Sequence, residues 1–296
     1  MISIVIPVYK KTELFIKNLT RNLPFFKDCE IIIVNDNPSE SIENYLTNFP
    51  VILLENKINL GFAGAVNEGV KKTGNKYIVL LNSDVILNGD NFKTAIRHFK
   101  NKDLFAVSFA QKEKDGKIVG KNTIFWKNGF LQHSAAQDLK EGINGWAEGG
   151  ACMIDKEKFE KLGGLDEIYS PFYWEDIDLS YRAWKSGYTI LFDPKVELEH
   201  YHGSTIDELF TPEIIKTIAY RNQFLFVWKN ITSFSLNIDH ILRLPLNLLM
   251  TIAKGDTLLT KGFLSALKRK MSHIAKKNAH PSTGIYTDKQ ILDRFK

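Results

Sequence analysis

The sequence of 296 residues has few cysteines, and the two that it has are far apart. Cys29 and Cys152 form no CxxC pair, so neither a disulfide framework nor a zinc knuckle is expected. A reducing compartment is the default for such a chain. We expect both thiols to serve as small apolar side chains of the core.

Long uncharged apolar runs are lacking as well. A membrane-spanning helix needs roughly 18 to 20 apolar residues in succession. The longest uncharged part of the apolar C-terminal region, Leu244 to Ala253, is interrupted by Pro245 and Asn247. Residues 1–11 have no basic region and no small-residue cleavage site, which predicts a first strand and not a signal peptide. A cytoplasmic protein is therefore expected.

Most of the chain also lacks an excess of charge of one sign. The net charge is +5, but residues 255–296 contain nine Lys and Arg against three Asp and Glu. The basic character therefore belongs to the C-terminal tail. No basic groove interleaved with aromatic residues is visible in the sequence, so nucleic acid is not an expected partner.

Segments typical of strands and helices alternate over the first hundred residues. The predicted strands are Ser3–Pro7, Glu30–Val34, Val51–Leu54 and Tyr77–Leu81, with helices that begin at Thr12 and span Phe62–Lys72. This alternation predicts an α/β domain with a mostly parallel central sheet and helices on both faces. Ligands of such sheets bind at the carboxyl ends of the strands.

The middle of the chain is less regular. Glu175–Lys185 predicts a helix, and Gly187 is expected to end it. Two further strands, Tyr188–Phe192 and Val196–His200, are predicted on either side of a turn at residues 193–194.

From about residue 205 the pattern becomes helical. One amphipathic helix is predicted by the apolar residues Leu259, Phe263, Leu267, Met271 and Ile274. We therefore expect a catalytic domain at 1–205 and a basic, amphipathic helical extension at 206–296. With Lys268–Lys270 nearby, the extension suits an anionic membrane surface and a peripheral location on its inner face. The alternative is an ordinary helical subdomain that packs on the catalytic domain or forms a homodimer.

Asn82, Ser83 and Asp84 directly follow the apolar strand that ends at Leu81. A carboxylate in this place points into the ligand crevice and can bind a hard divalent cation, which in turn binds a diphosphate. The alternative is that Asp84 caps the following turn.

Two other segments at strand and helix ends are candidate nucleotide neighbours. Asp36 ends the second strand, where it can accept a hydrogen bond from the imide N–H of uracil or thymine, or simply form a turn. Asn59 to Phe62, with Gly61 and Gly64, stand at a helix start that favours negative charge. Glycine packing explains that segment equally well.

The helix that follows Trp174 begins with Glu175 and Asp176. The helix dipole favours acids there, but an acid beside an aromatic platform is also what a general base for a sugar hydroxyl needs. His200 and His202 lie on one face of the last strand. Structural histidines are common, yet this pair favours a metal role for at least one of them.

In their order along the chain, these segments resemble the family 2 glycosyltransferases of the GT-A fold. The motifs that carry the resemblance are Pro-Val-Tyr (7–9), Asn-Leu-Gly-Phe-Ala (59–63), Leu-Asn-Ser-Asp (81–84), Glu-Asp-Ile-Asp-Leu-Ser-Tyr-Arg (175–182) and His-Tyr-His-Gly (200–203). The resemblance covers roughly residues 1–205. In appearance the nearest subgroup is that of the rhamnosyltransferase-like and galactofuranosyltransferase-like bacterial enzymes.

The resemblance implies a metal-dependent, inverting transfer of a sugar in bacterial surface polysaccharide synthesis. The donor would be a nucleotide diphosphate-sugar of the UDP or dTDP type, and the acceptor a hydroxyl of a glycan or lipid-linked glycan. Asp176 would be the catalytic base with Glu175 beside it. Asp84 and His200, with His202 as the second choice, would bind Mn²⁺ or Mg²⁺.

The resemblance also implies a set of binding residues. The nucleotide-sugar would contact Pro7, Tyr9, Asp36, Asn59, Gly61, Phe62, Asn82, Ser83 and Asp84. Trp174 and Trp146 would form a platform for sugar or acceptor. The sequence departs from the DxD pattern because Asn82 replaces its first acid, and an amide binds a metal less strongly than a carboxylate does.

Two rival functions belong to other classes. A nucleotidyltransferase would share the nucleotide half of the fold, but it would not require the Glu175–Asp176 helix or the late histidine. A catalytically silent nucleotide-sugar-binding protein would keep Asp36 and Asp84, while Asp176 would be dispensable.

Overall fold

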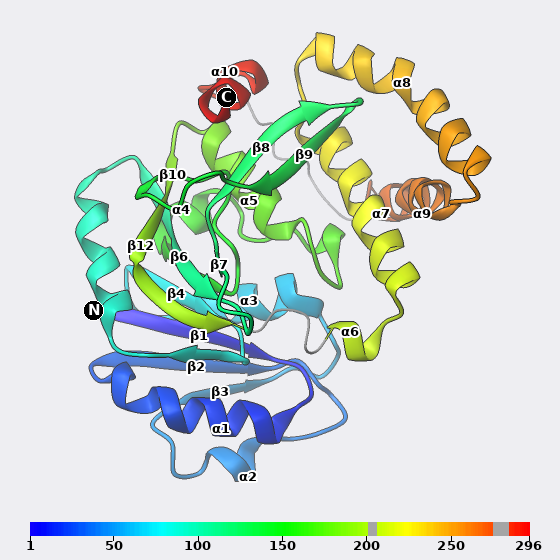
Figure 1. Ribbon diagram of the computed structural model, residues 1–296. Helices are drawn as coiled ribbons and strands as arrows, with labels where there is room; N and C mark the ends of the chain where they lie inside the picture. The colour runs from blue at the N-terminus through cyan, green and yellow to red at the C-terminus, as the bar shows by residue number, and fades with distance from the viewer. Residues whose placement is uncertain (201–205, 275–283) are drawn as a thin grey trace.

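The computed structural model describes residues 1–200, 206–274 and 284–296 (Figure 1). Its strands are β1 (Ile2–Val8), β2 (Cys29–Asn35), β3 (Ile52–Glu55), β4 (Tyr77–Leu81), β5 (Val85–Leu87), β6 (Leu104–Lys112), β7 (Ile118–Val119), β8 (Asn122–Lys127), β9 (Phe130–Ala135), β10 (Gly142–Ile143), β11 (Ala151–Asp155) and β12 (Thr189–His200). All but β8 and β9, which pair with each other, belong to one large sheet. Its main path runs β10-β12-β6-β11-β4-β1-β2-β3.

The N-terminal half of the sheet is parallel, as the alternation of strands and helices predicts. β1 pairs in parallel with β2 and β4, and β2 pairs in parallel with β3. β11 then inserts antiparallel between β4 and β6, so the whole sheet is mixed. Because β1, β2 and β4 run the same way, their carboxyl ends meet at one edge of the sheet.

Helices cover both faces of the sheet. The α-helices are α1 (Thr12–Asn22), α2 (Glu43–Leu46), α3 (Gly61–Lys72), α4 (Lys156–Lys161), α5 (Glu175–Lys185), α6 (Ile206–Leu209), α7 (Pro212–Asn230), α8 (Phe234–Ala253), α9 (Leu258–Ile274) and α10 (Asp288–Leu292). The 3-10 helices are η1 (Leu23–Phe26), η2 (Asn91–Lys100), η3 (Glu167–Tyr169) and η4 (Asp293–Phe295).

Alternation along β1 divides the core into two layers. Ile4 and Ile6 join a cluster that contains Phe15 of α1 and Phe92 of η2. Val5, between them, joins the opposite cluster with α3, α5 and α7. Both faces of the strands are buried, which is why their sequences are almost continuously apolar.

The last strand departs from the prediction. The expected turn at residues 193–194 is wrong, because β12 continues to His200 beside β6 with only a register shift between Asp193 and Glu197. The buried carboxylate of Asp193 accepts a hydrogen bond from the N–H of Lys195 and pairs with Arg97 at 2.8 Å. These contacts hold the extra residues as a bulge and not as a chain reversal.

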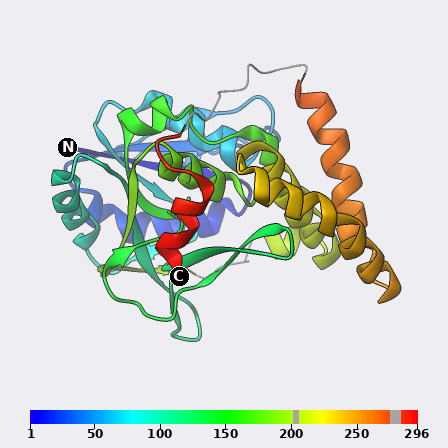
Figure 2. The same ribbon diagram turned by 90° about the horizontal axis from the view of Figure 1, so that it is seen from above.

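The C-terminal helices pack against the rest of the chain in two places. α9 lies along α7, with Leu259 buried and the Phe263 ring 5.3 Å from that of Phe224. α10 returns to α5, where Asp288 pairs with Lys185 at 2.9 Å. Figure 2 shows α8 and α9 at one end of the molecule. Within the described ranges, no helix is both long and apolar enough to cross a membrane.

Candidate active site

A cavity of about 680 Å³ opens at the carboxyl ends of β1, β2 and β4. It is hereafter called the cleft. The structure brings these sequence-predicted residues together in its walls: Pro7, Tyr9, Asp36, Asn59, Gly61, Phe62, Asn82, Ser83, Asp84, Trp146, Trp174, Glu175, Asp176 and His200. His202 lies outside the described residues.

Asp36 sits in the nucleoside end of the cleft predicted from the sequence and is almost completely buried. One carboxylate oxygen accepts from Asn56 Nδ2 (2.8 Å) and the N–H of Leu60 (2.9 Å). The other accepts from the N–H of Gly61 (2.8 Å). A carboxylate has about four lone-pair sites, so one remains for a donor such as an imide N–H. Burial raises the pKa of Asp36 against these hydrogen bonds.

The turn before α3 uses its N–H groups inside the protein. Leu60 and Gly61 donate to Asp36, and the N–H of Phe62 donates to the carbonyl of Pro171 at 3.2 Å. The helix start was predicted to favour the negative charge of a nucleotide. At the N–H groups of Leu60 and Gly61 that negative charge is the carboxylate of Asp36. Gly61 has φ 73°, and a Cβ there would meet Pro171 atoms at 3.3 Å. Packing is the reason for this glycine.

Asp84 and His200 form the predicted metal pair, and their side chains do meet. Asp84 Oδ1 lies 3.2 Å from His200 Nε2, and Asn82 Nδ2 lies 3.3 Å from the same nitrogen. His200 ends β12, and Asn82 and Asp84 follow the end of β4. β5, which comes directly after Asp84, pairs with β12 and places Val85 opposite His200, so the two segments lie side by side. Residues far apart in sequence thus converge at one point of the cleft.

The other ring nitrogen of His200 reveals which tautomer the site selects. Gln111 Nε2 donates to a carboxylate oxygen of Glu148, which can only accept, and this fixes the orientation of the Gln111 amide. Gln111 Oε1 therefore faces His200 Nδ1 at 2.6 Å and must accept its proton. In the neutral ring Nε2 then carries the lone pair that points at Asp84.

This arrangement fits a divalent cation. Neighbouring ligand atoms in an octahedral shell of radius about 2.1 Å lie about 3 Å apart, and Asp84 Oδ1 and His200 Nε2 are 3.2 Å apart. An acceptor that orients the far ring nitrogen is the usual support of a metal-binding histidine. Two protein ligands leave the remaining positions to phosphate oxygens and water, as is common for Mg²⁺.

Glu175 and Asp176 face the cleft from the start of α5. Burial, followed by the charge of Glu148, raises the pKa of Asp176 to about 7. Burial, followed by the charge of Asp176, raises the pKa of Glu175 well above its usual value. Glu175 Oε2 is buried without a hydrogen-bond partner in the described structure. Near neutral pH the pair therefore combines a neutral acid with a proton acceptor that is close to half-charged.

Asp178, the third acid of this helix, is not part of the cleft. It is fully buried and pairs with Arg182 at 2.7 Å and Lys229 at 2.9 Å. Although burial acts in the opposite direction, these two cations hold the pKa of Asp178 below its usual value. Asp178 therefore joins α5 to α7 as a permanently charged structural residue.

Glu148 is the functional candidate that the sequence did not reveal. It lines the cleft, accepts hydrogen bonds from Gln111 and from Asn122 Nδ2 (2.7 Å), and acts electrostatically on Asp176. It therefore contacts Gln111, which orients His200, and its charge acts on Asp176. Its segment is an irregular loop without periodicity. An acid before two glycines was the one feature of the sequence that could have indicated a functional residue there.

Comparison with known proteins decides the family. The sequence model described as "Glycosyl transferase family 2" matches residues 3–163, more than half of the chain. The chain belongs to this family. The glycosyltransferase is 23% identical over 260 residues to the low-salt glycan biosynthesis hexosyltransferase Agl10 of Haloferax volcanii, covering 84% of this chain and 82% of the relative.

A second relative is longer than this glycosyltransferase. The poly-beta-1,6-N-acetyl-D-glucosamine synthase of Staphylococcus epidermidis is 26% identical over 207 residues. The match covers 66% of this chain and 48% of the synthase, so this chain spans about half the length of that relative.

Solved structures show that the fold is GT-A. The crystal structure of GalNAc-T7 with UDP, GalNAc and Mn²⁺ has a TM-score of 0.59 at 15% identity, covering 77% of this chain and 48% of that one. The mannosyltransferase PcManGT of Pyrobaculum calidifontis, in complex with GDP-Man and Mn²⁺, has a TM-score of 0.54 at 12% identity, covering 95% and 76%. The expected family and fold are thereby confirmed, and both of these neighbours contain Mn²⁺.

The aromatic wall of the glycosyltransferase cleft contains both residues of the predicted platform. Trp146 and Trp174 are both largely buried and both pack against His133, with ring centroids 5.0 and 5.7 Å from it. Burial lowers the pKa of His133, which favours a neutral ring. Tyr173 is the more exposed aromatic residue, with 40% of its surface accessible.

The loop that presents these aromatics is held from α7. Tyr173 and Trp174 adopt positive φ angles of 69° and 77°, which non-glycine residues seldom do. The buried Asn222 of α7 donates hydrogen bonds to the carbonyls of Tyr169, Phe172 and Tyr173 at 2.7 to 3.0 Å. The helical part of the chain thus fixes an unusual backbone at the cleft, and no local sequence signal indicates this.

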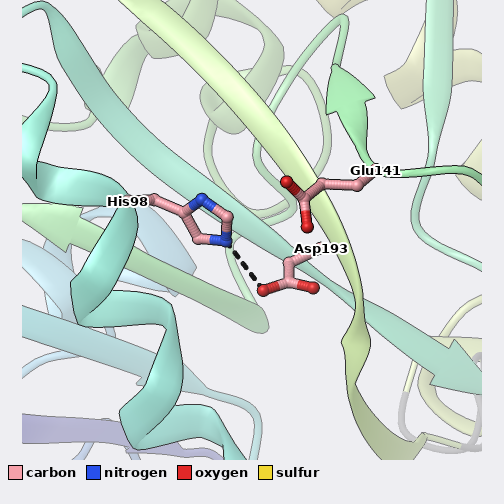
Figure 3. A group of neighbouring side chains, drawn as sticks. All are labelled: His98, Glu141 and Asp193. Carbon is pink, nitrogen blue, oxygen red and sulfur yellow. Dashed lines mark hydrogen bonds and ion pairs between the residues drawn. The ribbon is translucent and has the colours of Figure 1, made fainter.

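A second cluster of metal-type side chains lies outside the cleft. His98, Glu141 and Asp193 each offer a ligand atom within 4.8 Å of the others. Figure 3 shows the three side chains together, with the hydrogen bond between His98 and Asp193. The Arg97 guanidinium is 2.8 Å from Asp193 and 3.7 Å from Glu141. A cation would compete with Arg97 for the same carboxylates, so the cluster is better explained as the ion-pair network that supports the bulge in β12.

Proposed function

We propose that this family 2 glycosyltransferase transfers a sugar, with inversion, from a nucleotide diphosphate-sugar to a hydroxyl of a glycan or lipid-linked glycan. The donor would be of the UDP or dTDP type. The curated relatives are named for glycan synthesis, and the structural neighbours contain UDP or GDP-Man with Mn²⁺. A role in surface polysaccharide synthesis follows as part of the proposal.

One observation carries the proposal. The cleft places an Asp84–His200 pair, suited to a cation, in the same cavity as Asp176, a carboxyl group whose pKa of about 7 suits proton abstraction. A protein that only binds nucleotide-sugars would need the first feature and not the second.

The proposed reaction is a single displacement. The Asp176 carboxylate accepts the proton of the acceptor hydroxyl while that oxygen forms a bond to the anomeric carbon. The bond between the anomeric carbon and the diphosphate oxygen breaks, and its electron pair leaves with the nucleoside diphosphate. Asp176 then releases the proton to water. Neutral Glu175 can donate a hydrogen bond to a sugar oxygen throughout.

A divalent cation, Mn²⁺ or Mg²⁺, would be held by Asp84 and His200 and would supply positive charge beside the diphosphate leaving group. Because Gln111 accepts the proton of His200 Nδ1, the lone pair of the neutral ring is on Nε2, the atom that would face the cation. Asp36 would bind the base of the nucleotide through the lone pair that its backbone contacts leave open.

A donor screen tests the proposal. UDP-, dTDP- and GDP-sugars would be incubated with the protein and Mn²⁺ or Mg²⁺, and the release of nucleoside diphosphate measured, including slow hydrolysis by water. We expect metal-dependent release from one donor and no release after EDTA treatment. Binding and turnover that are both absent across the panel would contradict the proposal, while release that survives Asp176→Asn would remove Asp176 from the mechanism.

A further inference from the structure

The outer face of α8 exposes an unusual amount of apolar surface. Eight large apolar side chains on this 20-residue helix are exposed in the described structure. Six of them form the stripe named here the outer face: Phe234, Ile238, Ile241, Leu242, Leu249 and Ile252. Leu242 and Leu249 are 72% and 65% exposed. Soluble monomers rarely leave such a continuous apolar patch without a partner.

The stripe is a property of one side of the helix. At 100° per residue the six side chains fall within an arc of about 100°. The other side of α8 packs inward through His240, which accepts a hydrogen bond from Trp228 Nε1 at 3.1 Å and contacts the Gly129 carbonyl at 2.7 Å. These contacts hold the inner side of α8 against the protein, and the outer face remains exposed.

α9 does not share this property to the same extent. In the stripe predicted for it, Leu259 is buried and Phe263 packs on Trp228 and Phe224 of α7, whereas Leu267 and Met271 are 39% and 75% exposed. The predicted stripe of α9 thus has two exposed members among its described side chains, against six on the outer face of α8.

The charges around the outer face have one dominant sign. Residues 212–274, which hold α7 to α9, contain nine Lys and Arg against three Asp and Glu, and of these cations Arg221 and Lys229 are bound inside the protein, to the carbonyl of Ser170 and to Asp178. Exposed cations next to α8 include Lys254 at its end and Lys127 in the hairpin whose tip, Asn128, accepts a hydrogen bond from Asn247 of α8. Apolar side chains flanked by cations are the composition of helices that lie in anionic lipid surfaces.

We propose that the outer face of α8 docks on an anionic lipid bilayer, with the helix parallel to the membrane plane. Its apolar side chains enter the acyl boundary, and the surrounding lysines contact anionic headgroups. A second copy of the chain fits less well, because a symmetric contact through α8 would bring two strongly basic regions together. This proposal is independent of the proposed chemistry, since binding requires no turnover.

Vesicle flotation tests the docking surface. The full chain would be mixed with phosphatidylcholine vesicles with or without roughly 30% phosphatidylglycerol. We expect binding to the anionic vesicles, weaker binding to neutral ones, and loss of binding at high salt. Leu242→Gln/Leu249→Gln should weaken binding roughly tenfold or more, because two apolar side chains no longer enter the bilayer.

Matched controls separate the outcomes. Leu14→Gln/Tyr45→Gln alters exposed apolar residues of α1 and α2 and should bind like the wild type. Lys254→Glu/Lys261→Glu should weaken binding without touching the apolar face, in case the first variant folds poorly. A wild type that ignores anionic vesicles, or an α8 variant that binds them unchanged, overturns the proposal. So does a lipid-free dimer that the α8 variant converts to monomer, because the outer face would then belong to a second copy.

Discussion

Substituting the neighbouring carboxyl groups of Glu175 and Asp176 should remove different functions: a hydrogen-bonding group in the first case and the proton acceptor in the second. Glu175 is expected to be neutral, so Glu175→Gln preserves its hydrogen-bonding capacity and should retain most of the turnover. Asp176→Asn removes the proton acceptor and should lower turnover on the order of a hundred- to ten-thousandfold. Nucleoside diphosphate release measures both variants. Equal losses in the two would contradict the assignment of the base.

The pH dependence of turnover provides a second check on Asp176. Its pKa is raised to about 7 by burial and by Glu148, and only the deprotonated form accepts a proton. Turnover should therefore fall as the pH drops below about 7 and rise above it. In Glu148→Gln the neighbouring charge is gone, so the midpoint of the kcat/KM profile should move to lower pH. A midpoint that does not move would exclude Glu148 as a cause.

Gln111 is expected to act on the metal site without touching the metal. Gln111→Leu removes the acceptor that orients His200, and loss of such a partner typically lowers metal affinity ten- to hundredfold. Titration of turnover with Mn²⁺ would show a higher half-saturating concentration at similar maximal rate. Lys112→Gln, at the exposed neighbouring position of β6, serves as the control. Unchanged Mn²⁺ dependence in Gln111→Leu would refute the role.

Between elements, α7 supports the cleft loop through Asn222, next to Arg221, which donates to the carbonyl of Ser170 at 2.6 Å. Asn222→Ala removes the donor to the carbonyls of Phe172 and Tyr173, while the carbonyl of Tyr169 keeps its bond from Arg221, and each buried unsatisfied group costs about 1–3 kcal/mol. We expect a loss of unfolding free energy of at least about 2 kcal/mol and a fall in kcat, both measurable by denaturant titration and donor hydrolysis. Asn247→Ala on α8, which removes a single exposed hydrogen bond, should change little.

The elements predicted best are those whose sequence pattern is local. The β-branched strands, the helix Glu175–Lys185 and its stop at Gly187 follow from periodicity and glycine chemistry, and the structure confirms them. β12 was misread because the preference for a turn at Asp193 is overridden by a distant partner, Arg97. Tertiary packing likewise determines how much apolar surface α8 and α9 leave exposed, which no local pattern distinguishes.

The site shows the same division. The cleft residues could be predicted because they lie at strand ends and at a helix start, and a parallel sheet brings those positions together. Glu148, Gln111 and Asn222 stayed hidden because each acts through a partner more than thirty residues away. Their contribution depends on three-dimensional contact and leaves no spacing in the sequence.

The C-terminal helix α10 is joined to α5, in the middle of the chain, through a buried ion pair. Asp288 of α10 accepts from Tyr181 Oη (2.7 Å) and from the N–H groups of Thr232 and Ser233, beside Lys185, which is 2% exposed. Asp288→Ala leaves the Lys185 charge buried without its partner and should lower the unfolding free energy by about 3–5 kcal/mol. Thermal unfolding measures this loss. Asp293→Ala, at an exposed pair with Lys296, should be nearly neutral.

The return of α10 to α5 has a consequence for anyone who wishes to recombine such enzymes. A chimaera joined near residue 205 would separate Asn222 from the cleft loop and Asp288 from Lys185 at the same time. We therefore expect that the helical segment cannot be exchanged separately from the cleft. Altering acceptor choice in this chain calls for changes within the cleft wall, with both tethers left in place.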